Sequence, residues 1–266
     1  MTPSAPPHVE PLANRLPAIR PAGALACLAW LRRGLADLAT AWAVSLAHGV
    51  LFAGLGWLLV SHGWTDPHWG IAYTSGFLLI APLLATCFYA ISRALEQGEP
   101  VVSLARPFRL LWDNAGSLGL FAVMLAMLFS LWERVTAIMV GLTLKADVFA
   151  YGNQVFSYTA SILHDPNHWP VVAGFFAVGA LFAMIAFALS AVALPMIVDR
   201  QSDPVTALLT SLKAVRRNPL AMLVWAGVIT VLVGIGYLTM FIGLIIIFPL
   251  LGHATWHAYR GLVERT

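Results

Sequence analysis

Two histidines near the carboxyl terminus stand at a spacing that suits a ligand site. In the stretch GHATWHAYR (252–260), His253 and His257 lie four residues apart, so a helix places both imidazoles on one face. His48 falls at a similar depth in another apolar segment. Because neutral imidazoles bind transition metals and haem iron, the three residues predict a metal or haem site. The alternative is a set of interfacial histidines bonded to backbone carbonyls, aromatic hydroxyls or lipid headgroups.

Four further histidines accompany two similar segments, TDPHW (65–69) and DPNHW (165–169). These histidines are His62, His68, His164 and His168. Together with Asp66 and Asp165 they could form a periplasmic copper or zinc site. Asp-Pro is also common turn chemistry before a helix, so a pair of ordinary turns is the alternative.

Glu133 and Arg134 interrupt an otherwise apolar stretch, LFSLWERVTAIM. Charged side chains are costly inside a membrane and are often functional there. Adjacent residues on a helix point in different directions, so each of the two needs another partner or water. The pair predicts either a functional polar contact or a helix end that extends into the interface. The other apolar segments carry no charge away from their ends, which argues against a proton- or ion-coupled pump.

The composition places the chain in a membrane. Of its 266 residues 60% are hydrophobic and 10% are charged, whereas an ordinary soluble domain has about 25% charged residues. The net charge of +3 comes from basic residues scattered between apolar runs, which argues against nucleic-acid binding. Cys27 and Cys87 have no spacing typical of a disulfide framework or a zinc site. No nucleotide-binding loop, nucleophile elbow or HExxH motif occurs, so a non-enzymatic protein is favoured.

Six apolar segments are long enough to cross a bilayer as helices. They are residues 41–61, 70–92, 116–141, 170–198, 219–237 and 238–259. The last two share one apolar run, in which Gly234, Gly236 and Gly243 offer places to turn. All of the 15 Lys and Arg residues except Arg134 and Lys145 fall on one side of these spans. This positive-inside bias predicts cytoplasmic amino and carboxyl termini.

Residues 1–22 are rich in proline and lack an apolar core. We expect them to form a disordered cytoplasmic tail, followed by a single membrane domain over residues 23–266. In LAWLRRGLADL (28–38) the leucines follow helical spacing, which predicts an amphipathic helix with an apolar stripe. The stripe consists of Leu28, Leu31, Leu35 and Leu38.

A second amphipathic helix is expected in SDPVTALLTSLKAVRRNP (202–219). Asp203 suits the N-cap and Pro204 the first helical position, while Pro219 ends the helix. Its apolar stripe consists of Val205, Leu208, Leu209, Leu212 and Val215. Its basic residues, Lys213, Arg216 and Arg217, face anionic headgroups if the helix lies in the membrane interface. Docking of a partner protein is the alternative.

An internal repeat is visible between GFLLIAPLLATCFYAISRAL (76–95) and GLIIIFPLLGHATWHAYRGL (243–262), which align proline with proline and arginine with arginine. A third hairpin, near residues 107–200, has its own proline, Pro195. The chain therefore predicts an all-α, polytopic membrane protein of six spans in three units, each an amphipathic helix followed by a hairpin. Proline inside a span frees a backbone carbonyl, so the three helices could line a cavity or improve packing.

Three segments carry a family resemblance: ALPMIVDR (193–200), TSLKAVRRNP (210–219) and PLLGHATWHAYR (249–260). Over roughly residues 28–265 the chain resembles a bacterial integral-membrane family, domain of unknown function 2189, whose members are sometimes labelled as subunit I of cytochrome c oxidase. The resemblance implies a helical, multi-pass fold in the bacterial inner membrane. It implies little about activity.

Three function hypotheses remain open from the sequence. The leading one is a non-enzymatic accessory or assembly partner of a larger membrane complex, such as a respiratory complex. The second is a channel or carrier for an apolar or weakly polar solute, which the repeats and prolines motivate. The third is a haem- or metal-binding membrane protein built on His48, His253 and His257.

Overall fold

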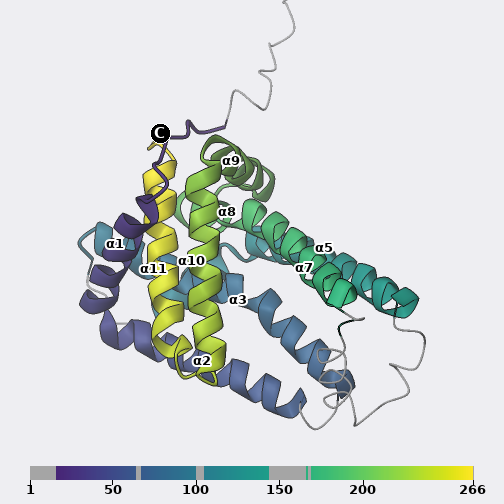
Figure 1. Ribbon diagram of the computed structural model, residues 1–266. Coiled ribbons are helices and arrows are strands. Elements are labelled where there is room, and N and C mark those ends of the chain that lie inside the picture. The colour runs from purple at the N-terminus through teal and green to yellow at the C-terminus, as the bar shows by residue number, and fades with distance from the viewer. Residues whose placement is uncertain (1–15, 64–66, 100–104, 144–165, 167–168, 266) are drawn as a thin grey trace, which may run out of the picture.

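The computed structural model describes residues 16–63, 67–99, 105–143, 166 and 169–265. Within these ranges the chain is helical, which confirms the all-α class. The helices are α1 (Ala26–Thr40), α2 (Trp42–Gly63), α3 (Pro67–Glu96), α4 (Ala105–Asp113), α5 (Ala115–Thr143), α7 (Trp169–Ser190), α8 (Ala193–Arg200), α9 (Pro204–Arg217), α10 (Pro219–Leu238) and α11 (Leu244–Leu262) (Figure 1).

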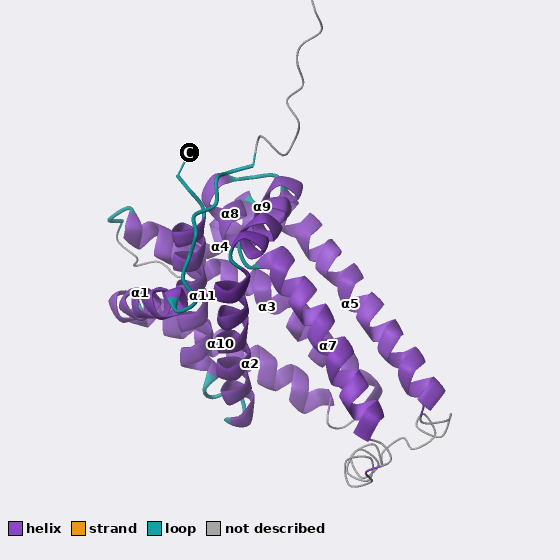
Figure 2. Cartoon of the chain, turned by 45° about the horizontal axis from the view of Figure 1, so that its top comes forward, coloured by secondary structure: helices purple, strands orange, loops and turns teal. Residues whose placement is uncertain are grey.

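The long helices pack as pairs of neighbours along the chain. Helix α2 packs on α3, α5 on α7, and α10 on α11. A shorter helix precedes each pair: α1, α4 and α9 respectively. The α5–α7 pair extends to one side of the other helices in both views (Figures 1 and 2). This order matches the expected succession of short helix and hairpin, while the internal repeat itself stays a prediction.

Four helices in the described part of the chain are long and apolar enough to cross a membrane. They are Trp42–Leu59 in α2, Ala115–Thr136 in α5, Trp169–Arg200 across α7 and α8, and Pro219–Leu238 in α10. Side chains in the first half of α3 lie outside the described residues, and the second half of α11 carries polar side chains. Several membrane-spanning helices are therefore supported, and crossing by α3 and α11 stays a prediction.

The turn between α10 and α11 lies at residues 239–243 and not at the expected boundary of residue 237. The residues with positive φ are Met240 (51°) and Phe241 (69°), so this turn does not use the nearby glycines for its left-handed backbone. The hydroxyl of Thr239 accepts a hydrogen bond from the N–H of Gly243 at 2.9 Å. The side chain of Thr239 thereby satisfies a backbone donor at the start of α11.

The expected span 170–198 is interrupted between α7 and α8. Pro195 has no N–H to donate to the carbonyl four residues earlier, so the helix is weakened at residue 191. The hydroxyl of Ser211, on α9, accepts from the N–H of Val192 at 3.1 Å and donates to the carbonyl of Ala188 at 2.8 Å. A side chain inserted into the ladder in this way is a recognised cause of a helix break.

Packing surrounds α8 on all sides. Its six residues from Ala193 to Val198 are buried, and α8 contacts α3, α9 and α11. The proline-bearing segments of the three expected units therefore meet one another directly. This contact favours the packing interpretation of the helix prolines over a solute path.

Helix α11 contacts helices from both halves of the chain: α1, α2, α3, α8 and α10. Two glycines allow close approach to it. A Cβ on Gly34 of α1 would lie 2.6 Å from the backbone nitrogen of Ala254, and one on Gly49 of α2 would overlap the carbonyl oxygen of Ile245. Hydrogen replaces a side chain at both positions, which lets helix backbones touch.

The end of the expected disordered tail is held in place. Ile19 and Val263 form an isolated β-bridge, and Arg20 N–H donates to the carbonyl of Leu262 at 2.7 Å. The side-chain amide of Asn218 bonds the backbone at Arg20 and Ala22. Residues 16–22 therefore pack with the membrane domain, and the two described ends of the chain lie side by side.

The amphipathic helices bury their expected apolar stripes only in part. Helix α1 buries Cys27, Trp30, Gly34 and Leu38, whereas Leu28 and Leu35 are exposed. On α9 the buried residues are Ala207, Thr210, Ser211 and Ala214, and none of the expected stripe is among them. On α9 small or hydroxyl residues meet the protein, and such residues permit close helix contacts. The leucines of its stripe are half-buried.

The ends of α9 follow the sequence prediction. Asp203 is the N-cap, its carboxylate accepts from the N–H of Thr206 at 2.9 Å, and Pro204 is the first helical residue. The hydrogen bonds from Thr206 hold the pKa of Asp203 below its ordinary value. Helix α9 ends at Arg217, two residues before Pro219.

Gly49→Ala is expected to lower the free energy of unfolding by about 1–3 kcal/mol, because its methyl group would press on the α11 backbone. Gly54→Ala, on the same helix with no atom near its Cβ position, is the matched control. We expect the control to be neutral or stabilising, since alanine favours helix. Unfolding of purified protein in mixed detergent micelles measures both. Equal losses for the two variants would contradict the close approach.

Candidate functional site

The imidazole of His253 is completely buried where α11 meets α2 and α3. Its Nε2 lies 2.9 Å from Ser45 Oγ on α2, and its Nδ1 lies 2.7 Å from Ser92 Oγ on α3. Both serines are buried as well. One side chain of α11 thus joins two helices that precede it by more than 150 residues in the chain.

The direction of these hydrogen bonds follows from the carboxylate of Asp37, which is bonded to Ser92. Ser92 Oγ lies 2.6 Å from Oδ2 of Asp37, on α1, and an ionised carboxylate only accepts, so Ser92 donates to Asp37. Ser92 must then accept from His253 Nδ1–H. The Nε2 atom of the neutral imidazole is left to accept from Ser45. We assign the tautomer by this argument.

Asp37 also accepts from His257, whose Nε2 lies 2.8 Å from Oδ2. The pair is partly buried, with 15% of the His257 side chain and 17% of the Asp37 side chain exposed. Burial raises the pKa of Asp37, but hydrogen bonds from His257 and Ser92 outweigh it and hold this pKa below its ordinary value. We call Asp37, Ser45, Ser92, His253 and His257 the His253 network.

His48 lies near the His253 network without joining it. Its Nδ1 donates to the carbonyl of Val44 at 2.7 Å, and its Nε2 is buried with no partner. The ring of Phe88 lies beside both imidazoles, with centroids 6.1 Å from His48 and 5.5 Å from His253. Phe108 stacks on the ring of His48 at 5.2 Å.

The three histidines expected to share a ligand are therefore hydrogen-bonded to different protein groups. Both ring nitrogens of His253 are already hydrogen-bonded, and His257 is bonded to Asp37. Among the described residues, no group of three or more His, Cys, Asp or Glu side chains is placed to hold a metal ion. A metal or haem at His48, His253 and His257 stays a prediction that would require the His253 network to rearrange.

The other candidate residues are placed less completely. His164 and His168 lie outside the described residues, as do the side chains of His62 and His68, so the outer metal site stays a prediction. Glu133 and Arg134 are both exposed on α5, within the apolar stretch Ala115–Thr136. No ion pair joins either residue to the part of the chain that the structure describes.

A second polar centre lies at the ends of α3, α8 and α11. Asp199 Oδ2 accepts from the Tyr259 hydroxyl at 2.7 Å and from Arg260 Nη1 at 3.2 Å. Arg93 Nε lies 3.8 Å from the other carboxylate oxygen, and Arg200 donates to the Tyr259 hydroxyl at 2.9 Å. Arg93, Arg200 and Arg260, from the ends of three helices, thus converge on one carboxylate.

Sequence reasoning missed Asp37, Ser45, Ser92 and Asp199. Serine and aspartate are common residues, and their partners lie 55 to 220 positions away in the chain. One signal was available for the network: most buried side-chain nitrogens and oxygens are hydrogen-bonded, so a histidine in an apolar helix calls for polar partners on its neighbours. Which serines supply those partners depends on the packing of α2 and α3 around α11.

The chain is similar to a family described by its membrane character. Residues 71–199 match the model of this family, "Predicted integral membrane protein (DUF2189)". The matched part runs from α3 to α8 and confirms the family resemblance stated from the sequence. It supports a membrane protein and names no activity. No curated protein and no solved structure matches the chain.

Ser92→Ala is expected to lower the free energy of unfolding by about 1–3 kcal/mol, because it leaves the buried Nδ1–H of His253 without an acceptor. Ser61→Ala is the matched control: its exposed hydroxyl bonds only the nearby carbonyl of Leu58. We expect the control to change stability by less than about 0.5 kcal/mol. Unfolding in mixed micelles measures both variants, and a silent Ser92→Ala would contradict the buried hydrogen bond between Ser92 and His253.

Asp37 gives a pH dependence with a defined sign. Its pKa is lower in the folded chain than its ordinary value of 3.8, so its ionised form stabilises the fold above that pH. This contribution is lost as the pH falls through the lowered pKa. Asp37→Asn keeps an acceptor oxygen and removes the charge.

The stability difference between wild type and Asp37→Asn should therefore shrink as the pH falls from about 6 to about 3. Thermal unfolding at a series of pH values measures it. Asp113→Asn, at an exposed position on α4, is the control and should show no such trend. A difference that grows on acidification would contradict the role given to the Asp37 charge.

Proposed function

We propose that this chain is a non-enzymatic membrane protein that acts as an accessory or assembly partner of a larger membrane complex. We further propose that the α5–α7 hairpin is the part that contacts the partner. The observation that carries the proposal is the exposed pair Glu133–Arg134 on α5, inside a stretch apolar enough to cross a membrane.

Exposure of this pair is costly in a lipid environment. An ionised side chain within a membrane span ordinarily faces protein or water and is paired there. In the described part of the chain neither residue has an ion pair, and both are exposed. A polar contact from a neighbouring transmembrane helix would satisfy them.

The hairpin also has little to bury within the chain itself. Helix α7 contributes no buried residue among its described side chains, and Phe176 and Leu181 are exposed. Its Gly174 and Gly179 face α5, where Met139 and Trp132 lie at 3.6 and 3.7 Å from their Cβ positions. The apolar outer face is left for lipid or a partner helix, and the charged pair gives that face a recognisable feature.

The His253 network supports a structural role over catalysis. Its members satisfy one another, and Ser45 and His253 have no exposed surface. A catalytic nucleophile and base need access to substrate and a place for it between them. A closed network of this kind instead fixes four helices at one end of the molecule.

We expect the tagged full chain, extracted from its native membrane in polymer-bounded lipid discs, to co-purify with another membrane protein in a fixed ratio. Glu133→Gln combined with Arg134→Gln should reduce that recovery roughly tenfold, which corresponds to about 1.4 kcal/mol. Quantitative mass spectrometry of the discs measures the ratio. Arg32→Gln combined with Arg33→Gln, on exposed positions of α1, is the matched control.

Two outcomes would overturn the proposal. One is a wild-type sample that contains no other membrane protein at a constant ratio. The other is an unchanged ratio in the Glu133–Arg134 variant, which would leave the pair as an interfacial helix extension. Unfolding of each variant in mixed micelles checks that reduced recovery does not come from lost stability.

A further inference from the structure

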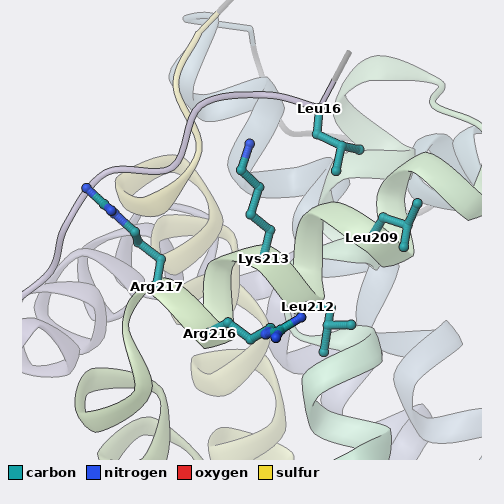
Figure 3. A pocket seen from close by; sticks show the side chains of 6 residues that line it. All are labelled: Leu16, Leu209, Leu212, Lys213, Arg216 and Arg217. Atoms are coloured by element: carbon teal, nitrogen blue, oxygen red, sulfur yellow. The ribbon is translucent and has the colours of Figure 1, made fainter. Parts of the chain in front are cut away.

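A groove of about 450 Å³ lies between α9 and the segment that leads into α1. Its lining consists of Leu16, Leu209, Leu212, Lys213, Arg216 and Arg217 (Figure 3). Three leucines and three cations line the groove, and no carboxylate is among them. The groove therefore offers an apolar wall next to a concentrated positive charge.

The charges of the groove differ from the other arginines at this end of the molecule. Arg93, Arg260 and Arg265 are each paired with Asp199 or Glu96. Arg216 and Arg217 are exposed, and no ion pair involves either of them in the part of the chain that the structure describes. They remain available for an anion from outside the chain.

Lys213 is hydrogen-bonded to the segment that leads into α1. Its Nζ donates to the carbonyl of Pro17 at 3.1 Å, which draws the amino-terminal segment over α9. Figure 3 shows Lys213 pointing toward that segment and Arg216 lying beside Leu212. An ammonium with one backbone bond keeps two donors and its full charge.

The apolar wall comes from residues that α9 does not bury against the protein. Leu209 and Leu212 are half-buried, while the core-facing residues of α9 are small or polar. A half-buried leucine in the groove can cover a hydrocarbon chain, and that contact is favourable in proportion to the apolar area removed from water. The groove is thus amphipathic in the same sense as a phospholipid.

We propose that the groove binds one anionic phospholipid. Its phosphate contacts Arg216, Arg217 and Lys213, and an acyl chain lies along Leu209 and Leu212. Charge complementarity carries this assignment, because a guanidinium pairs with phosphate oxygens through two parallel hydrogen bonds. A basic amphipathic helix beside a membrane is the usual form of such a site.

The amino-terminal residues of this chain are the competing occupant. Leu16 already lines the groove, and residues 1–15 precede it. Those fifteen residues contain one acidic side chain, Glu10, against one basic side chain, Arg15. They offer far less negative charge than a phosphate, so the lipid is the better match.

The test uses the purified full chain in uncharged detergent, titrated with short-chain phosphatidylglycerol and counted by native mass spectrometry. Arg216→Gln combined with Arg217→Gln should weaken binding by roughly 25-fold, at about fivefold for each cation near a charged lipid. This variant leaves the Lys213–Pro17 contact in place. Arg32→Gln combined with Arg33→Gln, also exposed cations on an amphipathic helix, should bind as wild type does.

Two further ligands distinguish an anionic-lipid site from a site for any lipid or for phosphate alone. Short-chain phosphatidylcholine should bind at least tenfold more weakly than phosphatidylglycerol, and Leu212→Ala should weaken phosphatidylglycerol binding without altering competition by inorganic phosphate. Equal binding of the two lipids, or equal losses in both arginine variants, would overturn the proposal. So would full displacement by millimolar inorganic phosphate, which would indicate a phosphate site without a lipid chain. A chain lacking residues 2–15 that binds much more lipid than wild type would assign the groove to the tail.

Discussion

A buried ring nitrogen without a hydrogen bond is costly, and at His253 both nitrogens are paired with serines from the helices around α11. One serine comes from α2 and the other from α3. Ser92 then needs its own acceptor, which brings in Asp37 from α1. Four helices are thereby fixed by consecutive hydrogen bonds, each of which is expensive to leave unmade. The close approach at Gly34 and Gly49 allows the helix backbones to come near enough for these bonds.

The second polar centre also joins several helices, and most of its members are charged. Asp199, on α8, accepts hydrogen bonds from Tyr259 and Arg260 of α11 and lies next to Arg93 of α3. Helices α3 and α11 are therefore joined a second time, here through α8. Salt bridges of this kind contribute little when exposed but hold geometry well when several share one carboxylate. The contacts described between α5 and α7, by comparison, are apolar or aromatic, such as Gly174 with Met139 and Phe175 with Trp132. The two polar centres thus hold α1, α2, α3, α8 and α11 together, while the α5–α7 hairpin lies to one side of them. This arrangement is consistent with a membrane protein that presents a hairpin to neighbouring proteins.

Much of the fold could be predicted from the sequence, since hydropathy and proline mark helix ends directly. The bounds of α2, α5, α9 and α10 agree with the expected segments to within a few residues. The break at residue 191 could not be placed, because it depends on Ser211 reaching across from α9. The exposed Leu28 and Leu35 show a related limit: periodicity finds an apolar stripe, but small residues decide which face packs. For the site, the sequence identified His253 and His257 and missed every partner, since those partners are set by tertiary packing.

The expected internal repeat, itself a prediction, aligns His253 of α11 with a residue of α3 that bonds very differently. At the position aligned with His253, α3 has Thr86, whose hydroxyl donates to the carbonyl of Leu83 on its own helix. Because this threonine hydroxyl is hydrogen-bonded within its own helix, it needs no partner from a neighbouring helix. The imidazole of His253 can reach beyond its own helix and has two ring nitrogens to satisfy, so α2 and α3 must both be present. At this pair of aligned positions, the threonine bonds within α3, whereas the histidine of α11 links α2 to α3.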